Sequence, residues 1–365
     1  MLNRLTAHGR SVPNLVVARR VVEKMVSAAQ RYAEDETGEA MVGLIVPGTR
    51  TNGVPTLYVL DTISPDESAV RQMHTFQQGD DRQDELIWWL QENWRVCRER
   101  RQTPSGAPLG AKWDVPLRYL GDWHKQPGYM IQPSGGDLMT AIHWIEDADN
   151  AMEFLLAPIV TLDHDATTAV METAVNFVMM PQGDGFNARI DFWYIDQRSR
   201  VFLPVVPAVY PNDQLPSLPD YPWHLVQEDR FLTEMAQLAG EKLFTSLVLW
   251  DANGEPPLEV CFLTARMGAD RVLLIVTPSN YPKSAPSARV APFAALDADK
   301  DPYQLFEQVW SQSESVADPP DWVWSDDKYL VDYIRAIEGA LGLETPVEGE
   351  AAPAQEEVPD ELGQS

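Results

Sequence analysis

The most constraining feature of the sequence is a polar loop between two apolar segments, residues 119–137, which read YLGDWHKQPGYMIQPSGGD. Residues 115–120 are mostly β-branched, aromatic or large and apolar, and they predict a strand. Proline and glycine break the chain at 127–128 and again at 133–136, and apolar residues at helical spacing follow from residue 138. The chain is therefore expected to pass from a strand through a tight loop into a helix, which brings the facing ends of the two elements together.

Four polar side chains lie on this path. His124 stands near the expected strand end, Gln126 and Ser134 lie in the loop, and Asp137 is at the start of the helix. A strand-end histidine or a helix-capping aspartate is common by itself. Together on one tight loop, however, an imidazole and a carboxylate form a common ligand set for a hydrolytic zinc ion.

The stretch resembles the JAMM metalloprotease motif of the JAB/MPN family. That motif is His-x-His-Pro, with ten residues between the second His and an Asp, and a Ser three positions before the Asp. His124, Gln126, Ser134 and Asp137 fall on this spacing. Gln126 stands where the family has its second histidine, and its neutral amide oxygen is a poorer zinc ligand than an imidazole nitrogen. The resemblance thus implies the fold and leaves the activity open.

The family also has an upstream glutamate just before an apolar strand. Residues 36–43, ETGEAMVG, resemble its prokaryotic form, in which Glu-Thr-Gly precedes a short apolar run ending in glycine. The matching residue is Glu36. Glu39 is a rival, although a strand beginning near Ala40 places it less well relative to Gly43. A solvated turn residue is the other interpretation of Glu36.

The resemblance implies a zinc-dependent hydrolase of isopeptide or peptide bonds at the C-terminus of ubiquitin or a ubiquitin-like protein. His124 and Asp137 would be zinc ligands, with Gln126 in the position of the third. Glu36 would be the general base that takes a proton from the zinc-bound water. Ser134 would help to hold the oxyanion of the tetrahedral intermediate.

Composition excludes several other classes of protein. The chain has 365 residues and a net charge of -27, which argues against nucleic acid or an anionic membrane surface as the main partner. Its two cysteines, Cys97 and Cys261, do not indicate a disulfide framework, and we expect a cytoplasmic location. No apolar run is long enough to span a bilayer.

The periodicity predicts an α/β (α+β) protein. Residues 12–207 are expected to form a JAB/MPN-like α-β-α sandwich with a mixed sheet. Its expected helices cover 12–33, 80–101 and 137–149. Its expected strands cover 40–46, 56–62, 115–124, 154–162, 174–180, 189–195 and 201–206, and the first two are expected to form an antiparallel hairpin. A proline-rich linker is expected over 208–226.

Residues 227–342 are expected to form a second domain, with helices at 228–243, 302–313 and 326–341 and strands at 246–251, 258–265 and 271–277. The strand that runs into Tyr281-Pro282 and then Pro286 resembles the ubiquitin-conjugating-enzyme and RWD fold. An active conjugating enzyme needs a thiolate after this turn, but the sequence has no cysteine after Cys261. A non-catalytic binding domain is therefore expected. Residues 343–365 are expected to form an acidic, disordered tail.

Three further histidines have no partner motif. His74 is interpreted as a structural or surface residue, and His143 as a packing residue of its helix rather than a ligand. His164 lies between two aspartates that could form a surface metal site with it, although such clusters usually just face solvent. Two hypotheses remain from the sequence. The first is a zinc isopeptidase, similar to a deubiquitinase, of a prokaryotic ubiquitin-like pathway. The second is a catalytically inactive JAB/MPN scaffold that binds a ubiquitin-like protein or partner subunits.

Overall fold

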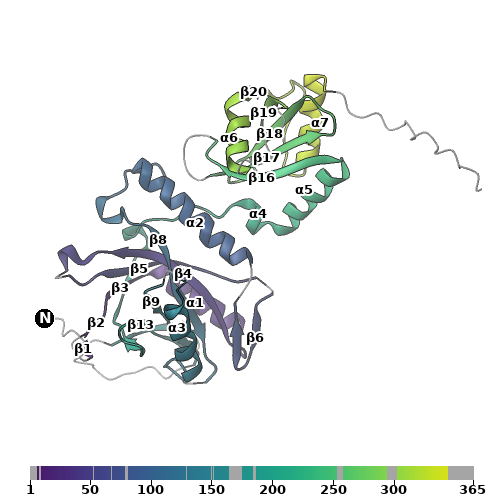
Figure 1. Cartoon of the computed structure of the whole chain (residues 1–365). Coiled ribbons are helices and arrows are strands. Elements are labelled where there is room, and N and C mark those ends of the chain that lie inside the picture. The colour runs from purple at the N-terminus through teal and green to yellow at the C-terminus, as the bar shows by residue number, and fades with distance from the viewer. Residues whose placement is uncertain are drawn as a thin grey trace, which may run out of the picture. The chain divides into compact units, whose positions relative to one another are not determined.

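The computed structural model of the chain describes residues 6–7, 10–51, 53–66, 68–78, 81–128, 130–148, 150, 152–163, 175–183, 186–252, 258–293 and 302–343. These residues form an α+β protein with several sheets, as the sequence predicts. The chain divides into two compact units (Figure 1). The first comprises Met1–Val226 with Asp251–Leu258, and the second comprises Gln227–Trp250 with Glu259–Ser365.

The first unit is built on an eight-stranded mixed sheet with the order β11-β12-β10-β8-β4-β5-β3-β15. At its centre, β4 pairs antiparallel with both β5 and β8, and β8 pairs parallel with β10. The eight strands are β3 (Asn14–Ala18), β4 (Thr37–Val46), β5 (Thr56–Ile63), β8 (Leu117–Lys125), β10 (Ile159–Thr161), β11 (Phe177–Gly183), β12 (Phe186–Asp191) and β15 (Pro207–Tyr210).

Helices cover both faces of this sheet. Figure 1 shows α1 (Arg19–Arg31) and α2 (Asp81–Arg100) on opposite sides of β4 and β5. Helix α1 buries an apolar stripe that runs from Val21 to Ala29. Helix α3 (Gly135–Glu146) packs its buried Ala141 and Ile145 beside the small sheet of β9 (Phe154–Leu156), β13 (Trp193–Asp196) and β14 (Leu203–Pro204).

The helix that the sequence predicts from residue 12 begins only at Arg19. Residues Asn14–Ala18 form strand β3, which lies between β5 and β15 and pairs parallel with both. The apolar residues of this segment fit a helical period as well as a buried strand. Val16 and Val17 are β-branched, however, and pairing with two neighbouring strands satisfies their backbone groups.

Several short strands lie where no strand was expected. Strands β6 (Val70–Gln72) and β7 (Thr75–Gln77) form a hairpin between β5 and α2. Strand β15, Pro207–Tyr210, begins one residue before the segment 208–226 that was expected to be a linker, and that segment also contains helix α4 (Trp223–Val226). Proline is tolerated in β15 because this strand is at the sheet edge and needs fewer N–H donors. Strands β1 (Thr6–Ala7) and β2 (Arg10–Ser11) form a further small sheet.

The second unit is a five-stranded antiparallel sheet with the order β16-β17-β18-β19-β20 and three helices. The sequence predicts the first three strands and not the last two. Their bounds are β16 (Leu243–Trp250), β17 (Glu259–Arg266), β18 (Arg271–Thr277), β19 (Ser287–Pro292) and β20 (Glu314–Val316), with α5 (Glu228–Gly240), α6 (Pro302–Gln312) and α7 (Leu330–Leu341).

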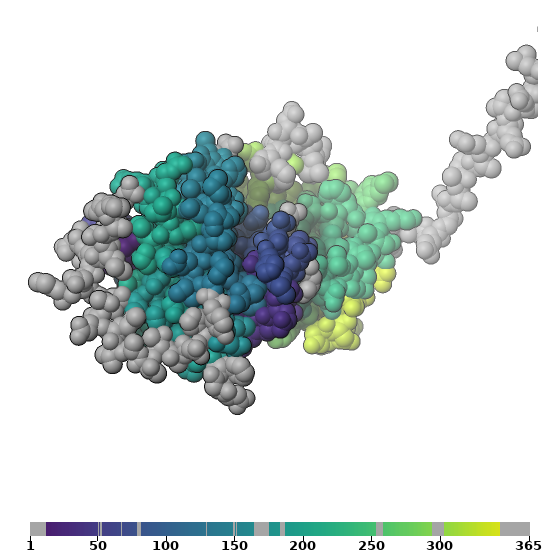
Figure 2. Space-filling view, turned by 90° about the horizontal axis from the view of Figure 1, so that it is seen from below, coloured from purple at the N-terminus to yellow at the C-terminus, as the bar shows by residue number. Residues whose placement is uncertain are grey.

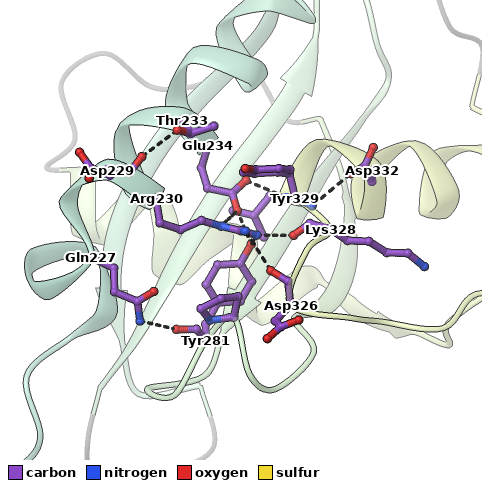
Figure 3. Close-up of polar contacts among 12 residues, drawn as sticks. Gln227, Asp229, Arg230, Thr233, Glu234, Tyr281, Asp326, Lys328, Tyr329 and Asp332 are labelled. Atoms are coloured by element: carbon purple, nitrogen blue, oxygen red, sulfur yellow. Dashed lines mark hydrogen bonds and ion pairs between the residues drawn. The ribbon is translucent and has the colours of Figure 1, made fainter.

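A polar network joins three segments of the second unit. Figure 3 shows Arg230 and Glu234 of α5 pointing towards Tyr281 and the residues before α7. The fully buried Glu234 accepts hydrogen bonds from the Tyr281 hydroxyl, from the Arg230 Nε at 2.8 Å and from the Leu330 backbone N–H at 2.7 Å. A buried carboxylate with three donors is well satisfied. The network therefore fixes the turn at Tyr281 against two helices.

Within the described residues, none of the helices combines the length and the apolar composition that crossing a bilayer requires. The acidic tail after residue 343 and the segment that carries His164 lie outside the described residues.

Candidate metallohydrolase site

The site lies where β8 ends and α3 begins. Ser134 is the N-cap of α3, and its Oγ accepts a hydrogen bond from the Asp137 backbone N–H at 3.2 Å. In return the Asp137 carboxylate accepts from the Ser134 backbone N–H at 2.5 Å. This reciprocal arrangement is a capping box. It fixes the Asp137 side chain at the first turn of the helix.

His124 and Gln126 point to the same side of the chain because they are two residues apart on an extended backbone. Extended pairing continues past the end of β8. The backbone N–H of His124 donates to Pro158 at 3.1 Å, and that of Gln126 donates to Val160 at 3.0 Å. Strand β10 and the residues before it thereby hold both side chains in register.

Two side chains converge on one carboxylate oxygen of Asp137. The His124 Nε2 lies 3.7 Å from Asp137 Oδ2, and the Gln126 Nε2 donates to the same oxygen at 3.5 Å. The Gln126 Oε1 is buried and has no hydrogen-bond partner among the described residues. A buried acceptor without a partner costs about 1–3 kcal/mol. It is the amide nitrogen of Gln126, and not this oxygen, that faces Asp137.

Glu36 precedes β4 and belongs to the same region. The first residues of β4 lie opposite the end of β8, with Gly38 paired to His124 and Thr37 paired to Lys125. Burial raises the pKa of Glu36, and the Asp137 carboxylate raises that pKa further. The charges of His74 and Lys125 oppose this effect. Glu36 is thus close enough to Asp137 for the two carboxylates to repel each other.

Burial lowers the pKa of His124, and the Asp137 carboxylate partly offsets that shift. The imidazole is therefore neutral at neutral pH. A neutral imidazole has one ring nitrogen with a lone pair, which is the form that binds a metal ion.

Glu39, the alternative to Glu36, lies in a different environment. Its carboxylate accepts hydrogen bonds from the Thr62 hydroxyl at 2.8 Å and from the Ser64 hydroxyl. Burial raises the pKa of Glu39, and the nearby charge that opposes the shift is that of Lys24. Glu39 faces α1 and the end of β5, and its surroundings give it no part in the group around Asp137.

Two residues of this region carry no signal in the sequence. Lys125 is almost fully buried, and its Nζ donates to the carbonyls of Tyr32, Ala33 and Asp35 at 2.9, 2.6 and 2.7 Å. It holds the segment between α1 and β4 in place and so positions Glu36. The sequence makes no prediction for Lys125.

The second residue of this region without a signal in the sequence is His74, which lies in the turn between β6 and β7. The Glu36 backbone N–H donates to Gln72 of this hairpin at 2.9 Å. A Cβ atom built on Gly38 would meet the Phe76 ring at 2.7 Å, so β7 packs closely on β4. The hairpin thus places His74 beside Glu36. A prediction of the hairpin would have been needed to find it, and its strands of three residues each are too short to stand out.

Helix α3 carries one further histidine, His143, which is not part of the group around Asp137. His143 is exposed on the helix, so the packing role expected from the sequence is wrong. Among the residues that the structure describes, no group of three or more His, Cys, Asp and Glu side chains is arranged to hold a metal ion. The available donor set is therefore one imidazole nitrogen, one carboxylate and the unpartnered Gln126 amide oxygen. With the Gln126 amide turned so that its oxygen faces the other two groups, these three donors would fit a divalent cation, more weakly than a set with two histidines.

No protein-family model matches the chain. A curated protein from Enterobacter hormaechei subsp. hoffmannii (strain UCI 50), named CD-NTase/cGAS isopeptidase, is 28% identical over 130 residues. In sequence, the chain is similar to a bacterial isopeptidase. The matched segment covers 35% of this chain and 57% of that protein, so the chain spans little more than half the length of its relative. This similarity is consistent with the JAB/MPN resemblance of the motif, and the roles of the individual residues stay predictions.

Proposed function

We propose that the chain is a bacterial isopeptidase-like protein whose hydrolytic site is formed by Glu36, His124, Gln126, Ser134 and Asp137. The observation that carries the proposal is the convergence of His124 and Gln126 on the Asp137 carboxylate, together with a buried Gln126 Oε1 that has no partner among the described residues. The similarity to an isopeptidase supports it independently. The substrates are conjugates or precursors of a ubiquitin-like protein.

The metal of this proposal is zinc, held by His124, Asp137 and the amide oxygen of Gln126. When bound, zinc lowers the pKa of a coordinated water and polarises the scissile carbonyl. The amide of Gln126 can turn by rotation about its last side-chain torsion, which is a soft one. The amide N–H group now donates to Asp137. After the rotation, the amide oxygen would take its place and face the cation.

The other residues act on protons and charge. Glu36 takes the proton of the attacking water and passes it to the leaving amine. Its raised pKa suits both steps, because a base with a pKa nearer to neutral is also a competent acid. Ser134 accepts a hydrogen bond from the Asp137 N–H, and its hydroxyl proton can still be donated to the oxyanion.

Cleavage of a linear fusion between a ubiquitin-like protein and a reporter tests the activity. We expect cleavage by the zinc-loaded protein, its loss with a chelator, and a drop of about 100-fold or more in Glu36→Gln. Glu39→Gln is the matched control, because its carboxyl lies apart from the site, and it should keep the rate. Equal cleavage by native protein and Glu36→Gln would contradict the assignment of the base.

A second candidate function rests on the hydrogen bond from Gln126 to Asp137. The amide N–H is directed to the oxygen that a cation would take, so the site is also stable as a metal-free binding surface. The first unit would then be an inactive JAB/MPN-like scaffold that binds a ubiquitin-like protein or partner subunits. Binding of the reporter fusion without cleavage, unchanged in Glu36→Gln and His124→Ala, would favour this function.

The second unit, in this proposal, is a ubiquitin-conjugating-like or RWD-like binding domain without catalysis. Cys261 is fully buried in β17, and burial raises the pKa of its thiol. A buried, protonated thiol is a poor nucleophile. Binding of a ubiquitin-like protein that persists in Cys261→Ala would support this role.

A further inference from the structure

The hairpin of β6 and β7 lies on the face of the central sheet to which His124 points. Gly38 of β4 is paired with His124 of β8, and the side chains of directly opposite residues in an antiparallel pair lie on the same face. A Cβ atom built on Gly38 would meet the Phe76 ring of β7 at 2.7 Å. This ring therefore fills the space over Gly38, on the His124 side of the sheet.

The turn of this hairpin is fixed beside Glu36. Gln72 is paired with Thr75, so Met73 and His74 form a two-residue turn between the strands. The Glu36 backbone N–H donates to the Gln72 carbonyl at 2.9 Å, which ties the residue before the turn to Glu36. Figure 2 shows dark blue residues that precede α2 beside purple residues of the N-terminal part of the chain. The turn thus lies at the edge of the proposed site.

Electrostatics agree with this placement of His74. The Asp137 carboxylate raises the pKa of Glu36, and the charge of His74 lowers it. One carboxylate therefore responds both to a proposed zinc ligand and to the imidazole of the hairpin. Such effects weaken quickly with distance. His74 and Asp137 thus belong to the same small region, although they are 63 positions apart in the sequence.

The turn is held loosely enough to move. Met73 is 53% exposed, and His74 is exposed beside it. Strands β6 and β7 have three residues each, and none of these residues is fully buried. A two-stranded hairpin has little stability of its own. A small shift of the turn towards His124 and Asp137 therefore breaks few contacts.

We propose that His74 supplies a second imidazole to the zinc ion of His124 and Asp137, from the hairpin instead of from position 126. This inference rests on the proposed function, because it assigns a further ligand to the same ion. Two imidazoles and one carboxylate are a ligand set of catalytic zinc sites. No such group is already arranged among the described residues, so the turn moves towards the ion when the ion binds.

Competition of the full chain against a fluorescent zinc chelator tests the proposal. His74→Ala should raise the dissociation constant for zinc by about tenfold or more, because even the loss of a group that only supports a ligand costs about 10 to 100-fold. Met73→Ala is the matched control, since it changes the other residue of the same turn, and it should leave the affinity unchanged. Both side chains are exposed, so neither change removes a buried contact.

A second background separates a ligand from a structural residue. In Gln126→His the loop supplies the second imidazole, so His74→Ala should weaken zinc binding less than it does in the native protein. An equal loss in both backgrounds would make His74 a structural residue of the turn and overturn the proposal.

Two further outcomes separate this proposal from the proposed function. Equal zinc affinity of His74→Ala and native protein, with binding abolished in His124→Ala, would overturn the role of His74 and leave the proposed site intact. A native protein that binds no zinc would overturn both.

Discussion

At the scale of single residues, Gln126 decides what the site can bind. Its amide nitrogen donates to Asp137, and its amide oxygen is buried without a partner among the described residues. A histidine at this position would offer one more strong nitrogen ligand. A fully apolar residue would offer none. As a zinc ligand, glutamine is weaker than histidine and stronger than an apolar residue. Residue 126 therefore determines the affinity of the site for zinc most directly.

We therefore predict that Gln126→His raises the affinity for zinc by about 10 to 100-fold, because an imidazole nitrogen is a better zinc ligand than an amide oxygen. Competition against a fluorescent zinc chelator measures the two dissociation constants. His143→Gln, a change of an exposed histidine outside the site, is the control and should have no effect. Equal affinities of Gln126→His and native protein would mean that residue 126 does not face the cation.

At the scale of elements, the capping box of α3 links folding to the site. Ser134→Ala removes the cap and should destabilise the protein by about 1 kcal/mol in urea denaturation. Ser134→Asn keeps a good N-cap residue and removes the hydroxyl. This variant should keep the stability and lose cleavage. If Ser134→Asn cleaved the fusion as fast as the native protein, Ser134 would be a structural residue only.

The sequence predicts the elements that carry the site better than those around them. Strand β4, strand β8 and helix α3 lie close to their expected positions, because their apolar residues and their glycine and proline breaks are clear. Strand β3 was assigned to a helix, because apolar residues at 15, 18 and 22 fit a helical period. The segment forms a strand because it pairs with β5 and β15, which are distant in sequence. No local pattern contains that information.

The candidate site, too, could be predicted from the sequence only where its signal is local. The spacing of His124, Gln126, Ser134 and Asp137 is a local signal, and the structure brings these four residues together. Lys125 and His74 act from outside the motif. The role of Lys125 depends on three carbonyls about ninety residues earlier in the chain, and that of His74 depends on a short hairpin. Such contacts arise only from the tertiary fold.

At the scale of the whole molecule, stability should depend on pH through His224. This histidine is buried in α4, and burial lowers its pKa from 6.5 to about 4. Between these values the unfolded chain binds a proton that the folded chain does not, so stability is lost as the pH falls through this window. We predict that His224 accounts for a loss of about 2 kcal/mol between pH 7 and pH 5.

Urea denaturation at the two pH values measures this effect. In His224→Gln the difference between pH 7 and pH 5 should shrink by about that amount, whatever the stability of the variant at pH 7. His143→Gln, which changes an exposed histidine of α3, should leave the difference as it is in the native protein. An unchanged difference in His224→Gln would show that other groups control the response to acid.

The whole molecule joins a candidate hydrolytic site in one unit to a second unit with its own sheet and no exposed thiol among its described residues. The central claim is that His124, Gln126 and Asp137 hold a zinc ion. Elemental analysis of the purified protein beside His124→Ala tests it most directly. We predict about one zinc ion per native chain and almost none in the variant. A native protein free of metal, or an equal zinc content in His124→Ala, would contradict the claim.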